Sequence, residues 1–224
     1  RSTRKESSAA SDVYKRQDSF WDKKISENQT EKPFRRDVIP HRSDVLLEGI
    51  DIFKDFLAIS ERKNGLNQIK IRRWDGTEQY YLPFESETYT AYTTTNIDFD
   101  TNILRYGYQS MTTPSSMIDF NMVTKEKTIM KEQEVLGGKF NKENYVSERL
   151  WVTASDGTKI PISIVKHKDT PKHSKTPLLL YAYGSYGATI DPYFSRVRLS
   201  LLDRGFVYDI AHIRVGQYLG RQWY

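Results

Sequence analysis

The chain has 224 residues and no cysteine, and its 34 Lys and Arg residues against 29 Asp and Glu give a formal net charge of +5. Without cysteine there is no disulfide framework, no cysteine-ligated zinc site and no thiol nucleophile. Hydrophobic residues make up 38% of the chain, enough for a packed core, while the longest apolar run is far shorter than the ~20 residues of a membrane span.

We expect residues 1–17 to be foreign to the protein. Ser7–Gln17 can be encoded without a break by the adapter DNA used in transposase-based sequencing libraries; the alternative is a disordered terminus rich in Ser, Ala and Lys. Either way, the segment is excluded from the fold prediction. It holds five basic and two acidic residues and so accounts for +3 of the net charge. The rest of the chain is close to neutral, which removes the argument for an anionic partner such as nucleic acid.

Residues 45–82 are predicted to form four strands. Apolar Ile69 and Ile71 alternate with Lys70 and Arg72, as in a strand with one buried face. Turn dipeptides such as Asn-Gly and Asp-Gly separate the apolar runs and favour hairpins. The predicted strands are Val45–Ile52, Phe56–Glu61, Gln68–Arg73 and Gln79–Leu82.

A second set of four strands follows with a similar spacing. These strands are Tyr89–Thr94, Ile103–Tyr108, Ser116–Met122 and Lys127–Glu132. Four antiparallel strands that recur every ~40 to 50 residues are typical of β-propeller blades. The pattern fits a β-sandwich equally well. Two blades cannot close a ring, so the propeller interpretation implies further sequence before this region.

The pattern changes near residue 140, after a charged, Gly-containing linker over Val135–Asn144. A hairpin, a strand, a helix and a further strand are predicted at Val146–Ser155 with Lys159–Val165, Leu178–Ala182, Phe194–Asp203 and Phe206–His212. The wholly apolar Leu178–Ala182 suggests a strand covered on both faces of a mostly parallel sheet. The change from antiparallel strands to strand–helix–strand predicts a domain boundary.

The segment Leu178–Gly187 is the strongest candidate for a functional site. A phosphate-binding loop is weakly supported, because the Gly-rich turn lacks a following Lys-Ser/Thr. Ser185 does not fit a nucleophile elbow, because Tyr183 stands where that motif needs glycine. The remaining interpretation is the loop that supplies an oxyanion-hole donor in α/β-hydrolases, with the Tyr183 hydroxyl as donor. The alternative is that Tyr183 packs as an aromatic at the end of the strand.

Other polar candidates are weaker. His167 and His173 lie in a Lys-rich loop without carboxylates at ligand spacing, so we expect no metal and no cofactor. His212 follows an apolar strand and is interpreted as a buried supporting residue rather than a catalytic base. Arg35-Arg36 and Arg72-Arg73 lack interleaved aromatic residues, so a solvated surface is expected rather than a nucleic-acid site.

Four motifs resemble the prolyl oligopeptidase family, and in particular its trypsin-like branch, oligopeptidase B: Arg105–Tyr108, Thr112–Ser116, Leu178–Gly187 and Arg198–Tyr208. That family has a seven-bladed β-propeller that caps an α/β-hydrolase domain. The resemblance implies a mixed fold, with residues 18–143 as the C-terminal two blades of the propeller. Residues 144–224 would be the N-terminal part of the α/β-hydrolase (peptidase) domain, truncated before the nucleophile. It also implies that the Tyr183 hydroxyl donates to the oxyanion.

The resemblance implies a cytoplasmic serine peptidase that cleaves short peptides after Lys or Arg, while the propeller excludes large folded proteins. Neither nucleic acid nor a membrane is expected as a partner, and the oligomeric state stays open. The Ser-Asp-His triad would lie beyond Tyr224, so the chain is expected to be an internal fragment that is inactive alone. A post-proline or acylaminoacyl peptidase and a non-catalytic propeller interaction module are the alternatives.

One loop departs from the family pattern. The family usually has Arg-Gly-Gly-Glu where this chain has Arg214–Gln217. Glycine can supply a turn with positive φ that Val215 would resist, and Gln217 replaces a carboxylate. The departure raises a question about the loop geometry or about the sequence itself.

Overall fold

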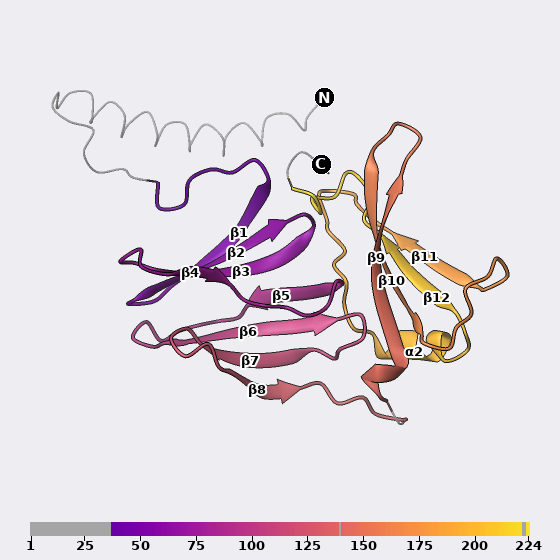
Figure 1. The fold of residues 1–224 in the computed structure, drawn as a ribbon, viewed down its shortest axis with the longest axis horizontal. Coiled ribbons are helices and arrows are strands. Elements are labelled where there is room, and N and C mark those ends of the chain that lie inside the picture. The colour runs from indigo at the N-terminus through magenta and orange to yellow at the C-terminus, as the bar shows by residue number, and fades with distance from the viewer. Residues whose placement is uncertain (1–36, 139, 221–222) are drawn as a thin grey trace, which may run out of the picture. The chain divides into compact units, whose positions relative to one another are not determined.

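The computed structural model describes residues 37–138, 140–220 and 223–224. In this part of the chain there are three four-stranded sheets and a single short α-helix (Figure 1). Arg42–Tyr224 forms one compact unit. The segment expected to be foreign, residues 1–17, lies outside the described residues.

The first sheet is an antiparallel meander in the order β1-β2-β3-β4. Its strands are β1 (Val45–Ile52), β2 (Phe56–Lys63), β3 (Leu66–Arg73) and β4 (Gln79–Tyr81). Asn64 and Gly65 form the two-residue turn between β2 and β3, with φ of 50° and 80°. Positive φ at both positions is the type I′ geometry that matches the twist of a hairpin, and it explains why Asn-Gly was a correct turn signal.

The second sheet repeats the same arrangement in the order β5-β6-β7-β8. Its strands are β5 (Tyr89–Thr93), β6 (Ile103–Ser110), β7 (Ser116–Asn121) and β8 (Lys127–Glu132). All eight predicted strands are therefore present, with ends that differ by at most two residues. The two sheets share one apolar core, whose largest fully buried members are Phe53, Phe56, Ile69, Ile71, Leu104, Tyr106, Phe120 and Met122.

The third sheet is mixed, in the order β11-β12-β10-β9. After a 3₁₀ turn at Lys142–Asn144, its elements are β9 (Tyr145–Thr153), β10 (Lys159–His167), β11 (Leu178–Ala182), the helix α2 (Arg196–Leu202) and β12 (Val207–Ala211). Only β11 and β12 run parallel, joined through α2, while β12 and β9 are antiparallel to β10. The expectation of a mostly parallel sheet is therefore wrong for the described residues.

The expectation that β11 is covered on both faces is also wrong. β11 is an edge strand that pairs with β12 alone, and all five of its residues are exposed, with Leu178 at 53% and Leu180 at 59%. The apolar core of this sheet lies at β10 and β12, where Leu202 of α2 packs with Tyr208 and Ile210 of β12. An apolar run indicates that a strand could be buried on both faces. It does not indicate which segments pack against those faces.

The helix α2 is shorter than predicted at its beginning. Ser195 has an extended backbone and precedes the first helical residue, while the Phe194 N–H donates to the Gln109 side chain at 3.2 Å. Phe194 is therefore held by the second sheet rather than by the helix. At the other end, Gly205 has φ of 84°, as expected for a glycine that terminates a helix.

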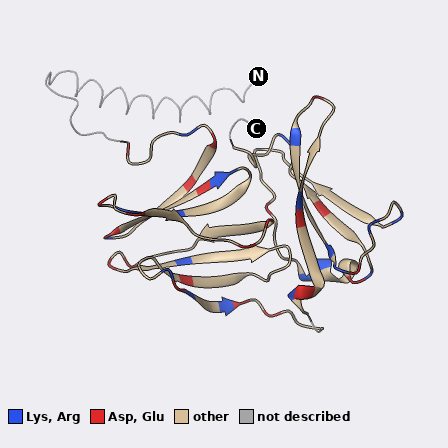
Figure 2. Ribbon diagram, viewed as in Figure 1, with Lys and Arg blue, Asp and Glu red and all other residues tan. Residues whose placement is uncertain are grey.

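Charged residues of both signs are interspersed along the strands rather than gathered by sign (Figure 2). Among the described residues, no His, Asp and Glu side chains group in a way that could hold a metal ion. The described part of the chain also contains no helix with the length and apolar character needed to cross a membrane.

Candidate functional site

Tyr183 comes directly after β11, where the strand passes into a loop. Its side chain is 43% exposed, and no described residue forms a hydrogen bond with its hydroxyl. The hydroxyl is thus available to a ligand at the end of the strand. The role of Tyr183 as an oxyanion donor stays a prediction.

The loop after Tyr183 is built on the close approach of two backbone segments. A Cβ on Gly184 would lie 2.8 Å from the Arg214 carbonyl oxygen, so only glycine fits there. Gly187 has φ of 72°, and its N–H donates to the Val215 carbonyl at 3.1 Å. Gly187 also pairs with Gly216 as a parallel bridge. The position of Tyr183 therefore depends on the 214–216 loop.

Val215 occupies the left-handed region, which a β-branched residue resists. Its φ is 76° and its side chain is 54% exposed. A β-branched residue at positive φ is a genuine outlier, because its Cβ crowds the backbone. The loop thus keeps a glycine-like turn with valine in it. Gln217 contributes through its backbone, since its N–H donates to the Thr189 hydroxyl at 3.3 Å.

His212 is buried, as expected, although its Nδ1 has no hydrogen-bond partner among the described residues. Its Nε2 lies 2.8 Å from the Ser163 hydroxyl, and its ring stacks on Tyr218 with centroids 3.6 Å apart and planes within 7°. Burial lowers the pKa of His212 to about 3, and the nearby positive charge of Arg149 acts in the same direction. The imidazole is therefore neutral at neutral pH and serves as a packing surface.

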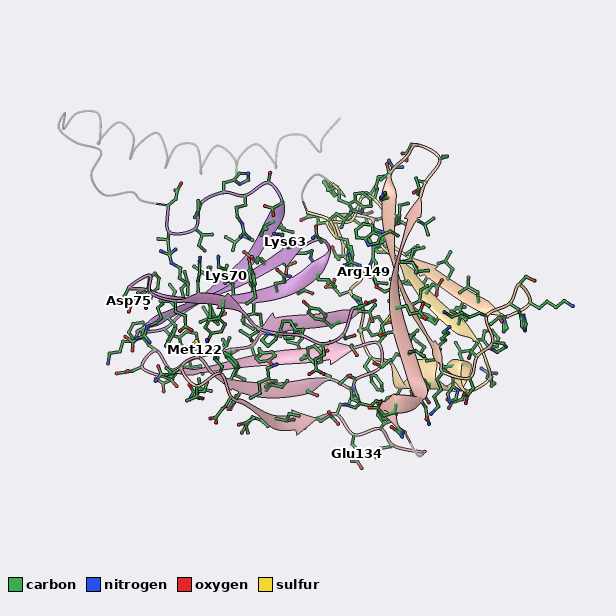
Figure 3. All side chains as sticks on the ribbon, in the orientation of Figure 1. Lys63, Lys70, Asp75, Met122, Glu134 and Arg149 are labelled. Carbon is green, nitrogen blue, oxygen red and sulfur yellow. The ribbon has the colours of Figure 1, made fainter. Side chains whose placement is uncertain are left out.

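Tyr218 is fully buried, and sequence reasoning missed it. The guanidinium carbons of Arg62, on β2, and Arg149, on β9 (Figure 3), lie 5.6 Å and 5.7 Å from the centre of its ring. Burial raises the pKa of Tyr218 to about 12. The edge of the ring covers Gly65, at the tip of the β2–β3 hairpin. Tyr218 thus contacts the first sheet as well as His212 of the third.

The segment that follows the Tyr183 loop is fixed to both of the first two sheets. Asp191 accepts two hydrogen bonds from Arg62, at 2.6 Å and 3.0 Å. The Thr90 hydroxyl, on β5, donates to the Pro192 carbonyl at 2.6 Å. These partners are separated by more than 100 residues in the chain, so no local pattern in the sequence could have revealed them.

Residues 14–133 match the family described as prolyl oligopeptidase, N-terminal β-propeller domain. The chain belongs to the prolyl oligopeptidase family. The first two sheets are therefore blades of the family's propeller, and the β-sandwich alternative is set aside. The match overlaps the last four residues of the segment expected to be foreign.

Relatives in this family carry different names. The chain is 45% identical to dipeptidyl aminopeptidase BI of Pseudoxanthomonas mexicana and 34% identical to protease 2 of Moraxella lacunata. Each of these matches covers 84% of this chain. The chain spans only 26–27% of those two proteins.

Solved structures of oligopeptidase B have the same fold over most of the chain. The enzyme from Leishmania major is 36% identical, with a TM-score of 0.75 over 82% of this chain. The enzyme from Trypanosoma brucei, with covalently bound antipain in a closed form, is 36% identical, with a TM-score of 0.76 over 83%. This chain covers 27% of each.

Proposed function

We propose that the complete gene product containing this chain is a serine peptidase that cleaves short peptides after Lys or Arg, with its propeller limiting access. The observation that carries the proposal is the structural match to oligopeptidase B at 36% identity over more than four fifths of the chain. Antipain is covalently bound in the Trypanosoma brucei enzyme. The 34% identity to protease 2 supports the same assignment.

We also propose that residues 18–143 belong to the propeller and that residues 144–224 begin an α/β-hydrolase domain. The parallel β11–α2–β12 unit is the supporting feature, because a strand–helix–strand crossover is the repeating element of α/β folds. The match to dipeptidyl aminopeptidase BI covers 84% of the chain, so it extends past residue 133, where the propeller match ends.

Within this assignment, the Tyr183 hydroxyl donates a hydrogen bond to the oxyanion. When the nucleophile attacks the scissile carbonyl, negative charge develops on the carbonyl oxygen, and a preorganised donor stabilises it. Tyr183 is suited to this because it is rooted at a strand end and its hydroxyl has no partner among the described residues. Such a donor contributes about 2.7–4 kcal/mol to transition-state stabilisation.

The test is Tyr183→Phe in the complete enzyme. Removing the hydroxyl should lower kcat about 10²- to 10³-fold with little change in KM, because the lost hydrogen bond forms in the transition state. Tyr186→Phe is the matched control, since Tyr186 lies in the same loop and is 93% exposed. Equal kcat for the Tyr183→Phe variant and the wild type would contradict the proposed role.

A dipeptidyl aminopeptidase is the second candidate, favoured by the 45% identity to a protein of that name. Fluorogenic peptides with Arg at the cleavage site separate the two activities when the amino terminus is blocked in one and free in the other. Cleavage of the blocked peptide supports an endopeptidase, and cleavage restricted to a free dipeptide supports the second candidate. A peptide with proline at the cleavage site and an acylated amino acid test the post-proline and acylaminoacyl alternatives.

The chain itself serves as the negative control in that panel. Its 224 residues contain no Gly-x-Ser-x-Gly sequence, so they hold no nucleophile of that type, and we expect no hydrolysis by the chain alone. Failure of the complete gene product to cleave any of the peptides would instead support a non-catalytic propeller module.

A further inference from the structure

We propose that Tyr218 is a positioning residue that connects the β2–β3 turn of the first blade to the loop holding Tyr183. The blade then sets where the Tyr183 hydroxyl stands, in addition to any role in limiting access. The inference rests on the proposed function of Tyr183. It is carried by a continuous series of contacts from Gly65 to Gly184.

The first step of this series is the contact between the Tyr218 ring and the β2–β3 turn of the first blade. The Tyr218 side chain is 1% exposed, and a Cβ on Gly65 would overlap its ring. Arg149 donates a hydrogen bond to the Asn64 carbonyl, at the same turn, and its guanidinium flanks the Tyr218 ring. The tip of one hairpin is thereby fixed against one aromatic ring.

The second step leads from Tyr218 to the Tyr183 loop. Two residues before Tyr218, Gly216 pairs with Gly187, and a Cβ on Gly216 would lie 2.7 Å from the Ala188 carbonyl oxygen. Gly184 approaches the same strip of backbone, since its own Cβ would lie 3.0 Å from the Gly216 nitrogen. These backbone segments are in direct contact, so a shift of Tyr218 displaces the backbone next to Tyr183.

The third step is a parallel connection from the same blade. Arg62 flanks Tyr218 and also forms the two-hydrogen-bond ion pair with Asp191, four residues after Gly187. A second carboxylate, Glu48, accepts from the Arg62 Nε at 2.7 Å and thereby orients the guanidinium. One blade therefore holds both the loop under Tyr183 and the segment that follows it.

The experiment uses a pair of glycine substitutions in the complete enzyme. Gly65→Ala places a methyl group in the Tyr218 ring, whereas Gly76→Ala adds the same group in the β3–β4 turn, where nothing lies within 4 Å. The two glycines have φ of 80° and 75°, so the backbone strain is matched. We expect Gly65→Ala to lower kcat at least 10-fold with KM nearly unchanged and Gly76→Ala to leave both unchanged.

Two further variants separate positioning from folding. Tyr218→Phe keeps the ring and should retain kcat, while Tyr218→Leu removes the stack on His212 and should lower kcat as Gly65→Ala does. Phe120→Leu shortens an equally buried aromatic in the second blade and should lose stability without losing kcat. A fall in kcat that follows the melting temperature across all of these variants would overturn the proposal.

Amide hydrogen exchange at Gly187 and Val215 gives a readout that does not depend on catalysis. We expect faster exchange there in Gly65→Ala than in Gly76→Ala. If exchange responds but neither Gly65→Ala nor Tyr183→Phe affects kcat, the connection stands and the proposed role of Tyr183 fails. If Tyr183→Phe lowers kcat while Gly65→Ala changes neither exchange nor kcat, the connection is wrong. A third outcome also overturns the positioning role: Gly65→Ala changes the exchange but not kcat, although Tyr183→Phe lowers kcat.

Discussion

The turn at Val215 holds a β-branched residue at φ of 76°, and this has a thermodynamic consequence. An L-residue with a Cβ pays about 1–2 kcal/mol in the left-handed region, and glycine does not. Glycine in turn loses more conformational entropy on folding, by about 0.5–1 kcal/mol relative to alanine. The strain of about 1–2 kcal/mol exceeds the entropy cost of about 0.5–1 kcal/mol. Little packing is lost with the valine side chain, because Val215 is exposed.

Val215→Gly should therefore raise the free energy of unfolding by about 0.5–1 kcal/mol. Urea denaturation of the wild-type and variant chains measures the difference. Val197→Gly is the control, since Val197 is also exposed but lies in α2, where glycine costs up to about 0.5 kcal/mol relative to valine. Opposite signs for the two substitutions are expected, and a destabilised Val215→Gly variant would contradict the strain argument.

Asp209 is a second residue whose environment sets a measurable property. It lies in the middle of β12, buried, with no hydrogen-bond partner for its Oδ1 among the described residues. Burial raises the pKa of Asp209 from 3.8 to about 6. The folded chain therefore binds a proton more tightly than the unfolded chain. The stabilisation is fully present below pH 3.8 and is lost as the pH rises through 6.

Asp209→Asn should remove this pH dependence, because asparagine stays neutral. Relative to wild type, the variant should gain about 2–3 kcal/mol of unfolding free energy between pH 4 and pH 7. The contribution of His212 has the opposite sign and cancels in the difference. Asp119→Asn is the control: two hydrogen bonds from Arg105 hold the pKa of Asp119 below its usual value, so that variant should lose stability as the pH rises. A difference for Asp209→Asn that does not vary with pH would rule out the raised pKa.

At the scale of elements, strands and turns were predictable because their signals are local. Asn64-Gly65 specifies a two-residue turn, and the alternation at Ile69 and Ile71 specifies which side chains of β3 are buried. The environment of a strand is not local. Leu178–Ala182 has the composition of a doubly covered strand, yet it is the exposed edge of its sheet. Composition could not show which segments pack beside it.

In the candidate site too, features with a local sequence signal were predictable and features that depend on distant residues were not. Tyr183 was found because a strand followed by a Gly-rich turn is a contiguous pattern. Tyr218 and Asp191 were missed because their roles depend on Arg62, which is 156 and 129 residues away in the sequence. Their only local signal was the Gly216 that precedes Tyr218, a glycine needed for close backbone approach. The sequence could thus locate the candidate donor but not the residues that hold it in place.

At the scale of the whole molecule, one partly buried ion pair connects β2 of the first sheet to the segment between β11 and α2. The Arg62 side chain is 5% exposed, and burial alone would disfavour its charge. The hydrogen bonds and negative charges of Asp191 and Glu48 more than compensate, so the pKa of Arg62 is raised. Removing one carboxylate from such a group leaves a buried charge only partly compensated, which costs far more than breaking a surface pair.

Asp191→Ala should lower the free energy of unfolding by about 3 kcal/mol, because Glu48 alone remains to balance Arg62. The coupling of the third sheet to the first should also weaken, so that amides of β10 and β12 exchange before those of β2 and β3. Hydrogen exchange with mass spectrometry resolves the two sheets in one experiment. Asp100→Ala is the matched control, because it breaks an exposed 2.8 Å pair with Lys54 and should cost far less stability. Simultaneous exchange of both sheets in Asp191→Ala would show that apolar packing, not this ion pair, couples them.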